Sequence, residues 1–326
     1  MSDERKIRVC YTSRKSNGGD KKMNAKKEEH TLWKRIKKNK LLYLFLLPAV
    51  LVITIFKYYP FLTSVYQSFF NWNGANVHLF NDVQNYIDLF LDKSFRSSFV
   101  NIIVVCIATV CINLTLPFLA AEIVTNLKSV RKQNFFKMGF IIPMVVPSMV
   151  VILLWKWILA GDYGVLNMLL EAVGLDHLVT PWLATSRTAL GSIIAINFPW
   201  IAGLPFLLYL AGRQNISEDL YEAAEIEGAG RLKKIIYIDI PLLASQRKLV
   251  ITYMLIQAFQ MFDQPYVLTS GGPGTSTLTP ALYIYQRAFN YNQFGYSAAV
   301  GVVLFLFVML VTVINQKFMK DSDNMG

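Results

Sequence analysis

Long runs of apolar residues alternate with polar connections along the chain. A helix that crosses a lipid bilayer needs roughly 20 mainly apolar residues. Six segments meet this requirement, at residues 41–58, 99–127, 138–159, 189–211, 249–268 and 296–316. The pattern therefore predicts an all-α, multi-pass membrane protein whose six transmembrane helices form one domain over residues 41–317.

Proline residues interrupt several of these segments. Pro143 and Pro147 lie four residues apart in the run IIPMVVPSMV of the third segment. Because each proline removes a backbone hydrogen bond of the helix, we expect a kink there. A kinked helix leaves room for a transport pathway, although packing alone also accounts for such a kink.

Composition favours the bilayer as the solvent of most of the chain. Hydrophobic residues make up 54% of the 326 positions and charged residues only 16%, and the mean hydropathy is +0.39. A soluble domain of ordinary composition is less apolar than this. The three cysteine residues are too few and too scattered for a disulfide framework. The three histidine residues fall in separate segments without the spacing of metal ligands, so no metal site is expected.

The positive charge is concentrated in one set of connections. Residues 1–40 hold 14 of the 32 lysine and arginine residues, and further cations lie around 128–137, around 213–248 and in the tail 318–326. Cytoplasmic segments of membrane proteins carry such an excess. We therefore expect both termini in the cytoplasm, with residues 1–40 as a partly disordered basic tail. The run LWKRIKKNK at its end predicts either a helix lying on anionic membrane lipid or a simple orientation signal.

The connection after the fourth segment has the sequence of an ordered structure. Ser217 precedes Glu218 and Asp219, as at the N-terminus of a helix. The helix-forming run that follows stops at Gly228 and Gly230, which suit a left-handed helix end. Helical sequence resumes at residues 231–238, and Pro241 opens the next helix. The stretch predicts two short helices joined by a glycine bend.

The spacing of this stretch resembles the EAA loop of binding-protein-dependent ABC importer permeases. The matching residues are Glu222, Ala223, Ala224, Gly228, Ile238, Ile240 and Pro241. Further runs resemble the sugar-type branch, which is maltose-like or multiple-sugar-like, at residues 140–157, 162–170, 205–212, 262–277 and 294–300. Two positions depart from the family pattern: Ile240 replaces the usual leucine, and Arg213 replaces a usual apolar residue.

The resemblance implies a fold and a set of partners. The EAA loop would lie in the cytoplasm between helices four and five and couple the permease to an ATPase subunit. Its expected coupling residues are Glu222, Ala223, Ala224, Gly228 and Pro241, with Glu222 paired to a basic residue of the ATPase. The expected partners are a second permease subunit, two ATPase subunits and an extracellular solute-binding protein in a bacterial cell membrane, with no nucleic acid.

The expected chemistry of the chain is transport and not catalysis. The run SGGPGTST at 270–277 lacks the lysine of a phosphate-binding loop. We therefore expect no cofactor in this chain, with ATP and magnesium bound by the ATPase subunits. The expected cargo is a carbohydrate, in particular an oligosaccharide. The alternatives are another solute such as a glycerol phosphate ester, an ion-coupled secondary transporter, or a structural scaffold.

Polar and aromatic residues at membrane depth are candidates for the substrate path, because polar groups in hydrocarbon are costly. The candidates are Asn197, Trp200, Tyr253, Gln257, Gln260 and Asp263. Tyr253, Gln257 and Gln260 recur at helical spacing and form one stripe. Amide and aromatic groups suit sugar hydroxyls and the apolar sugar face, but hydrogen bonding between helices explains the same stripe.

Overall fold

The computed structural model describes residues 39–201 and 203–318. The predictions for the basic tail and for the last residues of the chain therefore lie almost wholly outside the described residues. The chain divides into two compact units, residues 1–62 and 63–326. From Lys40 on, the described part of the first unit is helical: α2 (Lys40–Ile53), the π-helix η1 (Thr54–Tyr58) and the start of α3 (Tyr59–Gln67).

A short β-hairpin follows α3 and is a departure from the all-α prediction. Strands β1 (Phe70–Trp72) and β2 (His78–Phe80) pair antiparallel, with Phe70 opposite Phe80. The turn between them contains Asn73 and Gly74. Asn73 Oδ1 accepts from the backbone N–H groups of Ala75 and Val77, each at 3.0 Å, and Gly74 has φ 81°. An Asn-Gly pair is a strong hairpin signal. A prediction based on the hydropathy pattern alone does not include this hairpin.

The longest helix of the second unit is α5 (Lys93–Thr125), which follows the short helix α4 (Gln84–Leu91). At 1.5 Å per residue, its 33 residues extend about 50 Å, more than the bilayer hydrocarbon requires. Asp92 begins α5, because its carboxylate accepts from the backbone N–H groups of Ser94 and Phe95. The second apolar segment is thus a helix longer than a simple membrane span.

The third apolar segment is sharply bent at its prolines, and the predicted kink is confirmed. Helix α6 (Val130–Ile141) continues into the 3₁₀ helix η2 (Ile142–Val145), and α7 (Ser148–Ile158) leaves at 93°. Pro143 lies in η2 and Pro147 is the residue before α7. Both prolines therefore lie where the helix direction changes.

The fourth and fifth apolar segments are each divided between two helices. The fourth comprises α9 (Ala189–Ala195) and α10 (Leu204–Gln214), and the fifth comprises α14 (Ala244–Phe259) and α15 (Asp263–Thr269). Residues before a proline avoid helical backbone, and the sequence INFPWIAGLP interrupts the fourth segment at Pro199. Within the described residues, three continuous helices are long and apolar enough to cross a membrane, or four if the bent third segment is counted.

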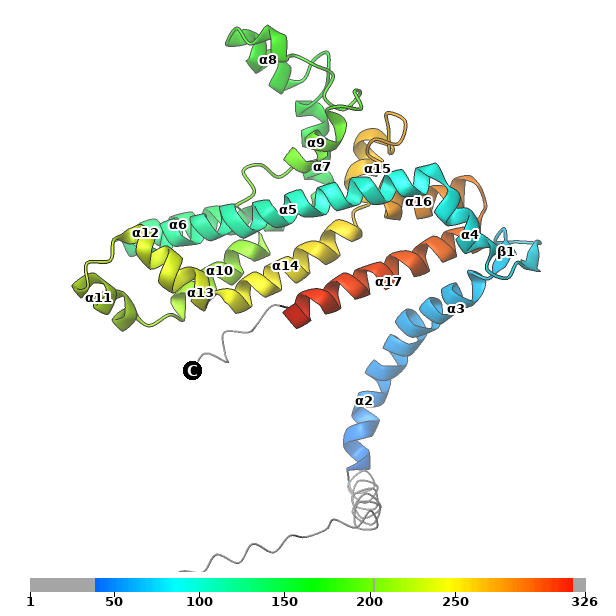
Figure 1. Ribbon diagram of the computed structural model, residues 1–326, viewed down its shortest axis with the longest axis horizontal. Coiled ribbons are helices and arrows are strands. Elements are labelled where there is room, and N and C mark those ends of the chain that lie inside the picture. The colour runs from blue at the N-terminus through cyan, green and yellow to red at the C-terminus, as the bar shows by residue number, and fades with distance from the viewer. Residues whose placement is uncertain (1–38, 202, 319–326) are drawn as a thin grey trace, which may run out of the picture. The chain divides into compact units, whose positions relative to one another are not determined.

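The remaining elements complete the second unit. They are α8 (Val165–Ala172), η3 (Asp176–Leu178), α11 (Glu218–Ile226), α12 (Arg231–Lys234), η4 (Ile235–Asp239), α13 (Ile240–Leu242), α16 (Pro280–Tyr285), η5 (Gln286–Asn290) and α17 (Phe294–Phe318). Helices α5, α10 and α14 lie side by side, and α14 also packs against α17 (Figure 1). A buried apolar cluster joins α5 to α10 and α14, and includes Ala121, Phe206, Tyr209 and Val250.

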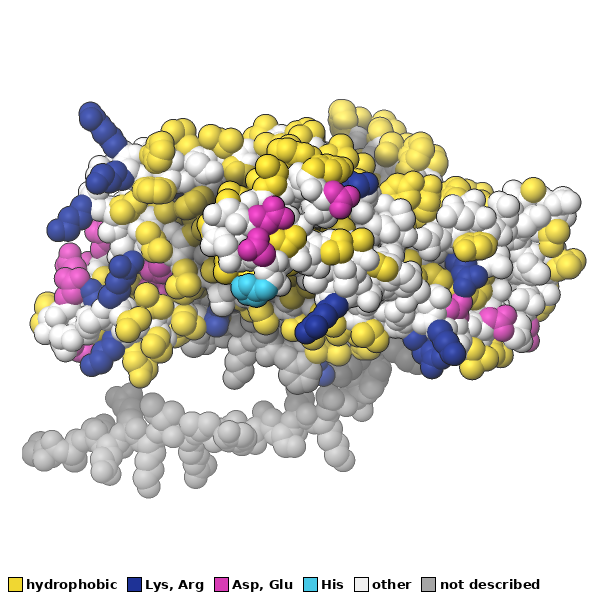
Figure 2. Space-filling view, turned by 90° about the horizontal axis from the view of Figure 1, so that it is seen from above, with side chains coloured by type: hydrophobic (Ala, Val, Ile, Leu, Met, Phe, Trp, Pro, Cys, Tyr) yellow, Lys and Arg dark blue, Asp and Glu magenta, His cyan; other side chains and the backbone are white. Residues whose placement is uncertain are grey.

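The surface of the second unit is apolar over long stretches. Large exposed hydrophobic side chains occur on α5, α7 and α17 among others. Figure 2 shows hydrophobic side chains over much of one face. Charged side chains lie near its middle, at its right and, in the greatest number, at its left end, where α11 and α12 lie in Figure 1. An apolar surface of this extent needs lipid or a partner protein to cover it.

Candidate functional site

The candidate coupling loop, residues 217–243, begins with a capped helix. Ser217 has extended backbone, and its Oγ accepts from the backbone N–H of Asp219 at 3.3 Å. Glu218 and Asp219 occupy the first turn of α11, where carboxylates interact favourably with the helix dipole. The predicted helix start at Ser217 is confirmed.

The end of α11 is a hydrogen-bonded bend centred on Gly228. Gly228 takes φ 76°, its N–H donates to Glu225 O at 2.9 Å, and the N–H of Ala229 donates to Ala224 O at 2.8 Å. These two bonds form a Schellman motif, in which glycine is favoured because its left-handed backbone carries no Cβ penalty. The prediction for Gly228 is therefore confirmed. It is wrong for Gly230, which has φ −67° and instead precedes α12.

The second half of the loop is held against the helix bundle. Lys234 Nζ donates to Glu225 Oε1 at 2.5 Å and so joins α12 to α11. Ile235 and Ile240 pack on the buried cluster between α5, α10 and α14. Pro241 lies in the first turn of α13, as the sequence predicts. The loop is thus a compact pair of helical segments with defined geometry.

The outer surface of the loop combines charge with exposed apolar side chains. Glu222 and Ala223 are exposed and Ala224 is half-buried, all three on α11. The large apolar side chains exposed nearby are Leu220, Ile226, Leu232, Ile236 and Tyr237, of which Ile226 is 87% and Tyr237 76% exposed. Such residues on a charged surface are typical of a site that another protein covers.

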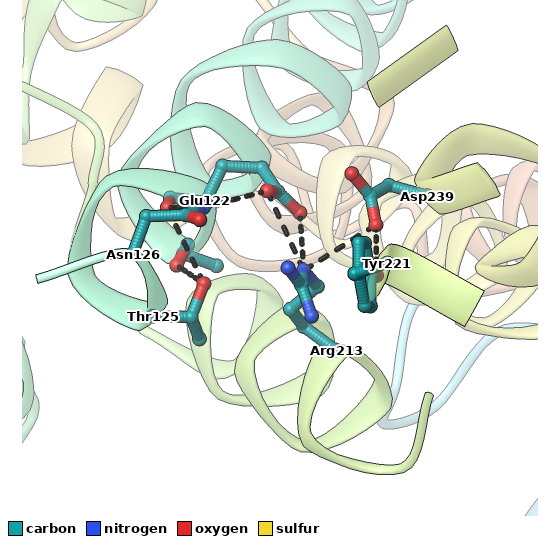
Figure 3. Close-up of polar contacts among 7 residues, drawn as sticks. Glu122, Thr125, Asn126, Arg213, Tyr221 and Asp239 are labelled. Atoms are coloured by element: carbon teal, nitrogen blue, oxygen red, sulfur yellow. Dashed lines mark hydrogen bonds and ion pairs between the residues drawn. The ribbon is translucent and has the colours of Figure 1, made fainter. Parts of the chain in front are cut away.

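Four side chains meet beneath the loop, and we call them the Arg213 cluster: Glu122, Arg213, Tyr221 and Asp239 (Figure 3). Arg213 Nε lies 3.3 Å from Glu122 Oε1 and 3.3 Å from Asp239 Oδ1. The Arg213 guanidinium lies over the Tyr221 ring, 4.0 Å from its centroid. The Tyr221 hydroxyl donates to Asp239 Oδ1.

The Tyr221 hydroxyl is a hydrogen-bond donor over the whole physiological pH range. Burial raises the pKa of Tyr221 well above its usual value, and the hydrogen bond to the Asp239 carboxylate raises it further. The sequence singles out Arg213 as unusual but gives it no partner. The pairing of Arg213 with Glu122 could not be predicted from the spacing of residues within a helix, because Glu122 lies 91 positions before Arg213 in the sequence.

The candidate path residues of the fourth segment are not helical. Asn197 has φ 73° and Trp200 has φ 55°, and both lie between α9 and α10. The Trp200 indole donates to Ile194 O at 3.1 Å. The prediction of a continuous helix there is therefore wrong, because Pro199 and Gly203 interrupt it.

The stripe on α14 is present, but it stays separate from Asn197 and Trp200. Gln257 Nε2 donates to the Tyr253 hydroxyl at 3.0 Å. Gln257 and Gln260 are exposed, and Asp263 is exposed in the first turn of α15. Among the described residues, the hydrogen bonds and ring contacts found join neither Asn197 nor Trp200 to this stripe.

A second charged network lies at the other end of α5. Arg287 Nη2 donates to Asp92 Oδ2 at 2.5 Å, and the Tyr283 hydroxyl donates to the same oxygen at 2.7 Å. Burial opposes ionisation of Asp92, but these bonds and those from Ser94 and Phe95 outweigh it and lower its pKa. In the part of the chain that the structure describes, no group of three histidine, cysteine or acidic residues has metal-site geometry.

Comparison with known proteins places this architecture among transport proteins. Residues 113–321 match the family model described as binding-protein-dependent transport system inner membrane component. The chain is 32% identical to the probable ABC transporter permease protein YurN of Bacillus subtilis, over 88% of this chain and 99% of YurN. It is 31% identical to the arabinooligosaccharides transport system permease protein AraP of the same species, over 84% of this chain and 87% of AraP.

A solved structure shares the fold. It is a bacterial ABC transporter involved in the import of the acidic polysaccharide alginate, and one of its chains aligns with a TM-score of 0.76 at 23% identity. The alignment covers 89% of this chain and 100% of that chain. The chain therefore has the overall fold of a chain of that transporter.

Proposed function

The chain belongs to the family of binding-protein-dependent transport system inner membrane components, and we propose that it is the permease subunit of an ATP-driven importer whose cargo is an oligosaccharide. The similarity to AraP, an arabinooligosaccharide permease by name, supports a carbohydrate cargo. Exposed amides beside a tyrosine on α14 suit sugar hydroxyls and ring faces. Proteins of this family are transport components, and the chemistry proposed for this chain is movement of the cargo without catalysis.

The observation that carries the proposal is the capped, glycine-bent loop at residues 217–243. A loop that transmits motion must be ordered before its partner binds it. The Ser217 cap, the Gly228 bend and the Lys234 bond to Glu225 supply that order. The exposed apolar side chains of α11, α12 and η4 then supply a surface that the ATPase subunit can bind. In this proposal Glu222 pairs with a basic residue of the ATPase subunit.

The proposed topology has six crossings with both termini in the cytoplasm. In it, α9 with α10 forms the fourth crossing and α14 with α15 forms the fifth. The candidate coupling loop lies between them on the cytoplasmic side, and residues 41–317 form the transmembrane domain. The distribution of lysine and arginine supports this orientation, and the Asp92 network then lies at the outer end of α5.

The substrate path proposed here runs past Tyr253, Gln257 and Gln260. Asn197 and Trp200 contribute to it from the non-helical stretch, together with Asp263 at the start of α15. Non-helical backbone at membrane depth is tolerated where it lines a polar cavity or is buried in protein. The exposure of Asn197, Gln257 and Gln260 in the single chain is compatible with a path completed by a second permease subunit.

The proposed assembly contains this chain, a second permease subunit, two ATPase subunits that bind ATP and magnesium, and an extracellular solute-binding protein. Reconstitution of the assembly in lipid vesicles tests it. Uptake of labelled arabino-oligosaccharides should require both ATP and the binding protein and should persist without an ion gradient. Uptake driven by an ion gradient in the absence of ATP would contradict the proposal, and uptake of glycerol phosphate esters in preference to sugars would contradict the proposed cargo.

A further inference from the structure

The Arg213 cluster joins the candidate coupling loop to α5 and α10. Glu122 lies in the last turn of α5, Arg213 near the end of α10, Tyr221 on α11 and Asp239 at the end of η4. The side chains of Glu122 and Asp239 are only 3% and 2% exposed, and that of Arg213 is 14% exposed. A single guanidinium therefore serves two buried carboxylates and one aromatic ring.

The two halves of the loop are attached to the bundle in different ways. The second half, α12 to α13, has apolar anchors, because Ile235 and Ile240 pack on the buried cluster. None of the nine residues of α11, all of which the structure describes, is buried. The ring and hydroxyl of Tyr221 are the contacts that join α11 to Arg213 and to Asp239.

Charge explains why Arg213 can hold this position. A buried carboxylate without a counter-charge is strongly unfavourable, and two carboxylates face Arg213. The cation therefore stays between them, and its planar guanidinium presents a face to Tyr221. Asn126 Nδ2 donates to Glu122 O at 2.7 Å and to Glu122 Oε2 at 3.4 Å, which further fixes the Glu122 side chain.

We propose that Arg213 is a positioning residue that holds α11 against the inner end of α5 through Tyr221. Glu222, Ala223 and Ala224 follow Tyr221 on α11, so the same contact sets where they lie. This inference rests on the proposed function only for its consequence, which is presentation of α11 to the ATPase. The positioning itself is a property of this chain and can be measured without the ATPase.

The test is a pair of distances measured by spin labels in the full-length chain, in lipid nanodiscs without ATPase subunits. The native cysteines are replaced, and one label is placed on α5 by Leu119→Cys. The second label is placed on α11 by Glu218→Cys, or on α12 by Lys233→Cys. When the Arg213 cluster is unmodified, each pair of labels should give one narrow distance distribution.

Two variants test the contact in different ways. Tyr221→Leu removes the ring and the hydroxyl but leaves Arg213 paired with both carboxylates, so the bundle should insert normally. Arg213→Leu removes the cation and leaves both carboxylates uncompensated. Each should broaden the α5–α11 distance distribution while leaving the α5–α12 distribution narrow, because α11 then keeps only its bonds to the bend and to Lys234. Arg131→Leu, the same change at an exposed position of α6, is the matched control and should alter neither.

The outcomes separate the positioning from the coupling. An unchanged α5–α11 distance in Tyr221→Leu, or equal broadening of both distances, would overturn the inference. Combining Arg213→Leu with Glu122→Gln and Asp239→Asn removes the cation together with both carboxylate charges, so no buried charge is left unpaired, and α11 should remain loose. A narrow α5–α11 distance in that triple variant would also overturn it. If α11 loosens but the ATPase subunit still co-purifies at the level of the unmodified protein, the positioning stands and the proposed coupling function fails.

Discussion

The backbone N–H of Ala229 donates to the carbonyl of Ala224 at 2.8 Å, across the left-handed residue Gly228. This bond closes the bend that follows Ala224, the last residue of the EAA sequence. The direction in which the chain leaves α11 therefore depends on a backbone conformation that only glycine adopts at little cost. The orientation of α12 relative to α11 depends on the same conformation.

Gly228→Val should weaken the bend. A Cβ at Gly228 meets nothing within 4 Å, so the cost is backbone strain from φ 76° and not a clash. That strain is on the order of 1–3 kcal/mol. Co-purification of the ATPase should fall while membrane insertion is unchanged. Gly230→Ala is the matched control, because Gly230 also has open space but an ordinary φ of −67°, and it should behave as the unmodified protein.

Glu222→Lys should disrupt association with the ATPase more strongly than Gly228→Val. Glu222 is exposed on α11, so the substitution leaves the packing of this chain intact and acts on the partner surface. A lysine there places a positive charge opposite the proposed basic residue of the ATPase, and the two positive charges repel each other. Affinity purification of the assembly measures the effect. Glu171→Lys makes the same change on an exposed position of α8 and should leave association intact.

The local structure of the loop could be predicted from the sequence, because caps and glycine bends depend on neighbouring residues. Ser217, Gly228 and Pro241 show this. The Arg213 cluster could not, because its residues come from four elements and meet only in the folded chain. The breaks in the fourth and fifth segments cannot be predicted from hydropathy for a different reason. Hydropathy scores how strongly a side chain prefers an apolar environment, and it is the same whether apolar residues such as Phe198 and Ile201 have helical or non-helical backbone.

Gln257→Leu combined with Gln260→Leu should raise the half-saturation concentration for uptake or abolish uptake. Both side chains are exposed in the single chain, and leucine removes their amide hydrogen bonds while keeping an apolar surface. Assembly and ATPase activity stimulated by the binding protein serve as internal controls and should be retained. Unchanged uptake would show that the stripe contributes to packing only.

Asp92→Ala should destabilise the N-terminal end of α5, because it removes the helix cap and the ion pair with Arg287 together. Loss of the cap alone costs about 1 kcal/mol. Asp92→Asn keeps a capping oxygen but loses the charge, so its midpoint of thermal unfolding should lie between those of Asp92→Ala and the unmodified protein. An equal midpoint for Asp92→Ala and the unmodified protein would contradict this role.

The Asp92 carboxylate should also make the stability of the folded protein depend on pH. The pKa of Asp92 is lower in the folded protein than its usual value. Its ionised form therefore stabilises the folded state fully above about pH 4, near the unfolded pKa, and this contribution is lost as the pH falls through the folded pKa. The difference in unfolding midpoint between Asp92→Asn and the unmodified protein should shrink on acidification below about pH 4.

Site-directed cross-linking tests the coupling assignment most directly. Ala223→Cys is introduced after replacement of the native cysteines, and the assembled transporter is treated with a short thiol-specific cross-linker that carries a second, photoreactive group. We predict a cross-link between position 223 and the ATPase subunit, and none from the matched exposed position in Glu171→Cys. An intact assembly in which position 223 fails to cross-link to the ATPase, or in which position 171 does so equally well, would contradict the account.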